Sequence, residues 1–290
     1  MSDVFAAPRQ GAWSRAFFFR RGDAHLVIRF APWRVNFDKD RALARHATTD
    51  LPIPPVLEIG EGLGQHYAIS ERAFGTILEE LDPGATERTL PALFRALDGI
   101  RVADVSDSTG AGVWSTDGRA SHRTWHDYLT SPPPDPFSDT GDIWRSNTAA
   151  SRPAALPEFD AAHAELRGLV EPCPEVRHLV HSDLLYGNVL AAHGRITAVF
   201  DWGCALVGDF LYDLAWLTFW APWYPGLAAV DLRAAARQHY DVIGLDVPAL
   251  DARVRCYEVR IGLSGQAYQA FVGEWDEFDA TARRVREILA

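Results

Sequence analysis

Two short polar motifs set among apolar runs constrain the fold of this 290-residue chain more than any other feature. The first, H-x-D-x-x-x-x-N, covers residues 181–188, and the second, D-W-G, covers residues 201–203. Three flanking runs have the composition of strands, at residues 177–181, 188–192 and 195–200. A tight turn at Gly194 would join the last two runs into a hairpin. Such a hairpin would fold Asp201 back beside Asn188.

The two motifs hold the oxygen groups that phosphoryl transfer requires. Transfer of a γ-phosphate needs one carboxylate that orients the attacking hydroxyl and accepts its proton, and it needs ligands for Mg²⁺. Asp183 is the predicted catalytic residue, and Asn188 and Asp201 are the predicted metal ligands, since Mg²⁺ binds few protein oxygens beside phosphate and water. The alternative is that all three are turn or strand-end residues. The complete set in order favours kinase chemistry over that alternative.

The residues after Asp201 distinguish between classes of kinase. A protein kinase needs a long activation segment that ends in A-P-E, whereas the next motif here, G-D-F-L-Y-D-L-A, already begins at Gly208. The short spacing leaves no room for that segment, so a small-molecule acceptor is predicted. Asp209 and Asp213 of this motif are predicted to cap the catalytic loop or the following helix. His181 is expected to be structural, because Asp183 is better placed to act as a base.

Taken in order, these motifs resemble the aminoglycoside phosphotransferase family of small-molecule kinases. The similarity also includes residues 14–17, 39–41, 51–54, 69–73, 173–202, 219–223 and 260–263. It implies an α+β, two-lobed, protein-kinase-like fold, in which a small antiparallel sheet with one helix precedes a larger, mainly helical lobe. Residues 1–73 would form the nucleotide-binding lobe, with a hinge at about residues 70–75. Residues 74–290 would form the catalytic and substrate-binding lobe.

The pattern along the chain fits this architecture. Predicted strands form a hairpin over residues 15–30 and a second pair at residues 55–60 and 66–71. Predicted helices cover residues 37–47, 158–170, 228–240, 251–272 and 276–289. A further helix is expected from Leu90, with Pro91 in its first turn. The prolines between residues 130 and 157 predict an irregular excursion, which either contacts substrate or is a surface loop without a role.

Nucleotide binding is assigned to the N-terminal lobe. The predicted nucleotide-binding residues are Gly11, Ser14, Arg29, Asp40, Glu71 and Ala73. Arg29 stands where kinases place a phosphate-binding Lys, with Asp40 as its partner, and a guanidinium can bind phosphate with two parallel hydrogen bonds. The alternative for Arg29 is a surface charge at the strand edge. Backbone groups at the hinge would meet the purine, so the sequence does not distinguish ATP from GTP as donor.

Acceptor binding is predicted from aromatic and acidic residues. The predicted acceptor-binding residues are Trp220, Trp223, Glu258 and Glu274, whereas Trp216 is expected in the core. An aromatic face can hold a sugar ring and its ammonium groups, although core packing is the alternative for the whole cluster. Relatives place acidic or amide residues where this chain has Ser264 and Gly265.

The resemblance implies a cationic, aminoglycoside-type antibiotic as acceptor, with hygromycin B first among the candidates, and hence antibiotic resistance. A kinase for another small alcohol, such as an amino alcohol, a macrolide or an antibiotic-pathway intermediate, is the runner-up. A nucleotide-binding pseudokinase without turnover is a third interpretation. Turnover of nucleotide on adding antibiotic would separate the three.

Composition narrows the possible partners. The net charge of −11 argues against a nucleic-acid partner and suits a polycationic substrate, although it also serves solubility. Three separated cysteines predict neither a metal-binding C-x-x-C nor a disulfide framework. The sequence has no signal-peptide pattern and no apolar stretch of membrane length, so a cytoplasmic protein without a membrane partner is expected. The oligomeric state stays open.

Overall fold

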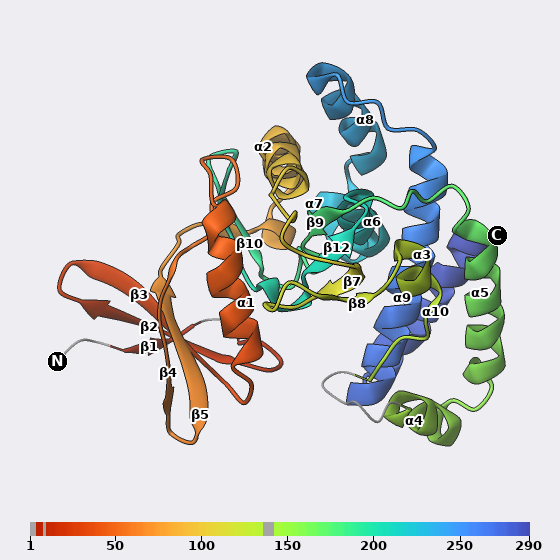
Figure 1. The fold of residues 1–290 in the computed structure, drawn as a ribbon, viewed down its shortest axis with the longest axis horizontal. Helices are drawn as coiled ribbons and strands as arrows, with labels where there is room; N and C mark the ends of the chain where they lie inside the picture. The colour runs from red at the N-terminus through yellow and green to blue at the C-terminus, as the bar shows by residue number, and fades with distance from the viewer. Residues whose placement is uncertain (1–3, 8–9, 136–141) are drawn as a thin grey trace.

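The computed structural model describes residues 4–7, 10–135 and 142–290, and Figure 1 shows a sheet at the N-terminal end and a mainly helical remainder. The sheet is antiparallel, with the strand order β1-β2-β3-β5-β4. Its strands are β1 (Phe5–Ala6), β2 (Arg15–Arg21), β3 (Ala24–Ala31), β4 (Val56–Gly62) and β5 (Gln65–Glu71). This arrangement confirms the two predicted strand pairs.

Helix α1 (Val35–Leu43) joins the sheet to the rest of the protein, and Figure 1 shows it standing between the two parts. The short helix η1 (Ala44–His46) continues it. Phe37 of α1 is buried against Ala31 and Ala68 of the sheet, in a small core separate from the main one. Helix α1 also contacts η3 (Trp202–Cys204), which holds most of the D-W-G motif. One helix therefore couples the sheet to the candidate catalytic segment.

Two small sheets carry the catalytic segment. The first has the order β11-β10-β6, with β6 (Thr76–Ile77), β10 (Val189–Ala192) and β11 (Arg195–Val199). The second has the order β8-β7-β12-β9, with β7 (Ala111–Trp114), β8 (Ala120–His122), β9 (His178–Val180) and β12 (Leu206–Gly208). Since β6 pairs with β10, the chain joins the catalytic hairpin soon after it leaves the N-terminal sheet. The domain boundary at residue 73 stays a prediction.

The C-terminal part of the protein is mainly helical and is built around α9, whose residues are mostly buried. The helices are α2 (Pro83–Arg101), α3 (Trp125–Thr130), α4 (Ile143–Ser151), α5 (Ala155–Leu169), α6 (Leu211–Trp220), α7 (Pro225–Ala228), α8 (Leu232–Ile243), α9 (Leu250–Val272) and α10 (Trp275–Leu289), with short helices η2 (Leu78–Glu80) and η4 (Ala221–Trp223). Helix α9 packs against α4, α5, α6 and α10. No helix in the described part of the chain is long and apolar enough to cross a bilayer.

The structure corrects the predicted start of α2. The helix begins at Pro83 and not at Leu90, because Asp82 caps it by accepting a hydrogen bond from the backbone N–H of Ala85 at 2.8 Å. Pro83 therefore fills the first helical position, where the lack of an N–H costs little. Pro91 lies inside the helix, where it is exposed to solvent. The prediction assigned the first-turn role to the wrong proline.

The structure also corrects the irregular excursion between residues 130 and 157. Helix α4 lies inside this range, and Asp135 accepts backbone hydrogen bonds of 2.7 to 2.9 Å from Asp142, Ile143 and Trp144 at its start. Trp144 is buried against Phe159, so packing stabilises a helix that the proline-rich composition of this segment did not predict. Residues 136–141 lie outside the described residues. A contact between this segment and substrate stays a prediction.

Candidate active site

The predicted hairpin brings the two motifs together. Val189 pairs with Val199 in the β10–β11 register, and the backbone N–H of Phe200 donates to the carbonyl of Asn188 at 3.0 Å. His193 and Gly194 form the turn with φ values of 52° and 70°, both in the left-handed region that such turns require. Asp201 follows Phe200 directly, so the hairpin returns it beside Asn188, which confirms the expectation.

Asn188 links the predicted metal site to the predicted catalytic residue. Its Nδ2 donates to the backbone carbonyl of Asp183 at 2.8 Å and to the Asp183 carboxylate at 3.1 Å. Because the amide nitrogen points toward Asp183, the amide oxygen of Asn188 is directed away from it. No hydrogen bond to that oxygen exists within the described ranges, so it is free to bind a cation.

Asp201 lies in a conformation that few residues adopt. Its φ of 65° is in the left-handed region, where residues other than Gly are strained. Burial and then the negative charge of Asp40 raise the pKa of Asp201, while Arg29 opposes the shift. Burial and then the charge of Asp201 likewise raise the pKa of Asp183. A cation between these acidic groups would offset their repulsion, and the oxygens of Asn188 and Asp201 fit Mg²⁺ completed by phosphate and water.

Buried residues fix the backbone of the catalytic loop. His181 is 0% exposed; its Nδ1 accepts the N–H of Asp183 at 3.2 Å and its Nε2 donates to the carbonyl of Phe200 at 3.1 Å. Burial lowers the pKa of His181 to about 4, so its ring is neutral at pH 7. Asp213 accepts the N–H groups of His181 and Ser182 at 2.9 and 2.7 Å. The scaffold roles expected for His181 and Asp213 are therefore confirmed.

The N-terminal lobe reaches this loop through α1. Asp40 pairs with Arg29, and its Oδ1 also accepts the backbone N–H of Trp202 at 2.7 Å. The Arg29 side chain is only 16% exposed, so it is not a surface charge. Lys39, which the sequence analysis missed, donates from Nζ to the carbonyl of Gly203 at 2.8 Å. The signal in the sequence was its place next to Asp40, within residues 39–41 of the family similarity.

The other predicted nucleotide-binding residues lie at the edges of the N-terminal sheet. Gly11 and Ser14 form a tight turn before β2, in which a Cβ on Gly11 would lie 3.0 Å from the Ser14 hydroxyl. Glu71 ends β5, and Ala73 follows in the connection to β6. The roles of these four residues stay predictions.

The structure corrects two of the four predicted acceptor-binding residues. Trp220 is 4% exposed and belongs to the core, whereas Trp216 is partly exposed, which reverses the expected order. Glu258 is 1% exposed and pairs with Arg233 of α8 at 2.6 Å, so its carboxylate is already used. Trp223 is half-buried and stacks on Phe219. Exposure on helices depends on which face packs inward, and α6 buries almost all of its surface.

Truncation of Trp220 should destabilise the protein. We expect Trp220→Ala to lower the free energy of unfolding by about 3–5 kcal/mol, because a large buried ring leaves a cavity. Urea unfolding followed by fluorescence or circular dichroism measures this value. Trp216→Ala, on the same helix but partly exposed, is the control and should cost clearly less. Equal losses for the two variants would contradict the burial of Trp220.

Glu274 stays a predicted acceptor-binding residue, and Tyr186 is a further exposed residue next to the candidate catalytic residue. Glu274 is exposed at the start of α10, and its side chain makes no capping hydrogen bond. Tyr186 lies within the catalytic loop between Asp183 and Asn188, with 46% of its surface exposed. The sequence analysis missed Tyr186 because it counted this position only as a spacer of the H-x-D-x-x-x-x-N motif.

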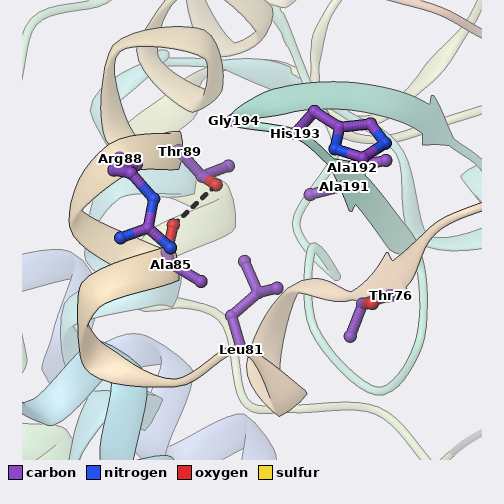
Figure 2. A pocket seen from close by; sticks show the side chains of 9 residues that line it. All are labelled: Thr76, Leu81, Ala85, Arg88, Thr89, Ala191, Ala192, His193 and Gly194. Carbon is purple, nitrogen blue, oxygen red and sulfur yellow. Dashed lines mark hydrogen bonds between the residues drawn. The ribbon is translucent and has the colours of Figure 1, made fainter.

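A cavity of about 730 Å³ lies elsewhere on the molecule, and Figure 2 shows the residues that line it. Its walls are α2 and the turn of the β10–β11 hairpin, with Arg88 on one side, His193 and Thr76 on the other, and Leu81 between the two sides. None of Asp183, Asn188 and Asp201 lines it. The cavity lies at the opposite end of the hairpin from the two motifs, so it is separate from the candidate active site.

Comparisons with known proteins agree with this geometry. The sequence profile of the phosphotransferase enzyme family matches residues 5–245. Hygromycin-B 4-O-kinase of Escherichia coli is 37% identical over 273 residues, which cover 92% of this chain and 75% of that protein. A thermostable mutant of aminoglycoside phosphotransferase APH(4)-Ia, in ternary complex with AMP-PNP and hygromycin B, aligns with a TM-score of 0.84 at 33% identity, covering 99% of this chain and 94% of that chain. Aminoglycoside 2′-phosphotransferase-IIIa, in its GDP complex, shares the fold with a TM-score of 0.64 at 14% identity, covering 99% of this chain and 92% of that chain.

Proposed function

Since the chain belongs to the phosphotransferase enzyme family, we propose that it transfers the γ-phosphate of a nucleoside triphosphate to a hydroxyl of hygromycin B or a closely similar aminoglycoside-type antibiotic. The fold is that of the kinase-like aminoglycoside phosphotransferases, as predicted, and the chain is a phosphotransferase that acts on a hydroxyl group. The observation that carries the proposal is the arrangement of Asp183, Asn188 and Asp201. The β10–β11 hairpin returns Asp201 beside Asn188, and the Asn188 amide donates hydrogen bonds to Asp183.

In this proposal Asp183 orients the acceptor hydroxyl and takes its proton as the oxygen attacks the γ-phosphorus. The bond from that phosphorus to the β,γ-bridging oxygen breaks, and a nucleoside diphosphate leaves. Mg²⁺, held by Asn188 and Asp201, would neutralise charge on the phosphates. Arg29 contributes a permanent positive charge near Asp201, since the charges of Asp40 and Asp201 raise the pKa of its guanidinium against the effect of burial. The N-terminal sheet and α1 hold this group in place through Asp40.

The acceptor class follows from the relatives and from the charge of the chain. Two of the named proteins, hygromycin-B 4-O-kinase and APH(4)-Ia, act on or bind hygromycin B, and the chain carries a net charge of −11 that favours a polycationic ligand. We propose ATP or GTP as the donor, because backbone groups at Glu71 and Ala73 would read the purine. A cytoplasmic location and antibiotic resistance as the biological role follow from the same proposal.

A coupled assay of nucleoside diphosphate release tests the function. The purified chain, with Mg²⁺ and either ATP or GTP, should release diphosphate when hygromycin B is added, and the antibiotic should gain the mass of one phosphate. Amino alcohols and macrolides in the same assay test the other class of acceptor. Release with one of those and none with hygromycin B would move the proposal to another small-molecule kinase. Binding of nucleotide and antibiotic without release would indicate a pseudokinase.

A further inference from the structure

Tyr186 stands in an unusual conformation inside the catalytic loop. Its φ of 63° is in the left-handed region, which costs a bulky side chain about 1–3 kcal/mol. The next residue, Gly187, has a φ of 94° at no such cost. The strained residue is nevertheless a tyrosine, with 46% of its surface exposed. An exposed aromatic ring held at this cost, between Asp183 and Asn188, points to a role in ligand contact.

The core beneath Tyr186 fixes the direction of its ring. Trp220 meets the ring edge to face, with centroids 6.0 Å apart and planes at 74°. Trp220 in turn lies against Phe219 at 4.8 Å, and a Cβ on Gly265 would come within 3.3 Å of its indole. The small residue on α9 therefore makes room for the indole that supports Tyr186. The departure from the relatives at Ser264 and Gly265 is thereby linked to the aromatic ring in the loop.

Helix α10, which carries two exposed carboxylates, begins near the core that supports this ring. A Cβ on Gly265 would lie 3.3 Å from the Trp220 indole and 3.5 Å from Thr281 of α10, so α10 packs beside the tryptophan that supports Tyr186. Glu274 and Glu277 are exposed and lie three positions apart at the start of α10, so they share one helix face, which Thr281 continues four positions later. Neither forms an ion pair with another described residue. An aromatic face beside two unpaired carboxylates suits a ring that carries ammonium groups.

We propose that Tyr186 is a specificity-determining residue for the acceptor, which packs an aminocyclitol or amino-sugar ring against its phenol while Glu274 and Glu277 bind the ammonium groups. This inference rests on the proposed function and adds the surface that selects the acceptor. Trp220 supports the tyrosine from the core and does not touch the acceptor. Tyr186 and Asp183 belong to the same loop. An acceptor ring packed on the phenol would therefore lie next to the Asp183 carboxylate, and a hydroxyl of that acceptor would react there.

Steady-state kinetics of Tyr186→Asn and Tyr186→Phe test the proposal. Asn tolerates the left-handed backbone, so Tyr186→Asn removes the ring without straining the loop. It should raise KM for hygromycin B about 2- to 30-fold, the equivalent of one aromatic contact to a cation. KM for the nucleotide should stay near the wild-type value. Tyr186→Phe keeps the ring and should restore most of the acceptor affinity.

The carboxylates have their own variants and a matched control. Glu274→Gln and Glu277→Gln should each raise KM for hygromycin B, with a larger effect at low salt, because screening weakens exposed charge interactions. Glu287→Gln removes a charge from the opposite end of α10 and should leave both KM values unchanged. An unchanged acceptor KM in Tyr186→Asn would overturn the inference. Equal increases in both KM values, with a lower melting temperature, would also overturn it, because they indicate a structural role.

Calorimetric titration with hygromycin B separates this inference from the proposed function. If the wild-type protein binds the antibiotic without turnover, the function fails, and weaker binding by Tyr186→Asn than by the wild type would still support the inference. Turnover by the wild type with equal acceptor affinity in Tyr186→Asn supports the function and rejects the inference. A wild-type protein that neither binds nor phosphorylates hygromycin B rejects both.

Discussion

Replacing Asp183 by Asn should lower kcat about 10²- to 10⁴-fold, the usual contribution of a positioned base. The amide keeps the shape of the side chain, and its oxygen can still accept the hydrogen bond that Asn188 donates at 3.1 Å. The phosphate-binding residues are untouched, so the dissociation constant of the nucleotide should change little. Single-turnover kinetics would give the rate, and calorimetry would give the nucleotide affinity.

The control for this variant is Asp23→Asn, at the exposed turn between β2 and β3, which should keep wild-type kinetics. A variant at Asp183 that keeps more than about a tenth of the wild-type kcat would exclude Asp183 as the base, because that role contributes at least about 10²-fold. Loss of nucleotide affinity together with the rate would show instead that Asp183 holds the phosphates.

Replacing Asp201 by Ala should remove activity and Mg²⁺-dependent nucleotide affinity together. Loss of a metal ligand forfeits several kcal/mol of charge stabilisation in the transition state, or roughly 10²–10³-fold in kcat. Calorimetry of nucleotide binding with Mg²⁺ and with EDTA separates the two contributions. The wild type should bind more tightly with Mg²⁺, and this difference should disappear in Asp201→Ala.

Backbone strain is the competing cause in this variant. Ala in the left-handed region costs about 1 kcal/mol, so a loss of activity alone does not identify a metal ligand. Asp201→Asn is the matched variant, because Asn adopts a φ of 65° more readily and keeps one oxygen ligand. It should retain part of the Mg²⁺ dependence that Asp201→Ala loses. An unchanged Mg²⁺ dependence in Asp201→Ala would contradict the assignment of this residue to the metal.

Residues close in sequence could be placed before the structure was known. The hairpin that carries Asn188 and Asp201 depends on a turn and on alternating strand residues, which act over a few positions. The same holds for the hairpin of β2 and β3. The pairing of Arg29 with Asp40 was also expected from the resemblance, and the structure contains it.

Contacts between distant segments decided the rest. Whether Trp216 or Trp220 is exposed depends on the packing of α6 against α9, and almost every residue of α6 is apolar, so its sequence does not mark the inner face. Glu258 forms an ion pair with Arg233 of α8, whereas Glu274 stays exposed at the start of α10, and neither outcome could be predicted from sequence spacing.

The sequence by itself determined the arrangement of the loop, because Asn188 and Asp201 flank one hairpin and Asp183 lies only five positions before Asn188, so their geometry is local. Only the tertiary structure decided which residues face the acceptor. The exposure of Tyr186 depends on a tryptophan from α6 and on the space above a glycine of α9, and such burial is a property of packed neighbours and not of sequence spacing.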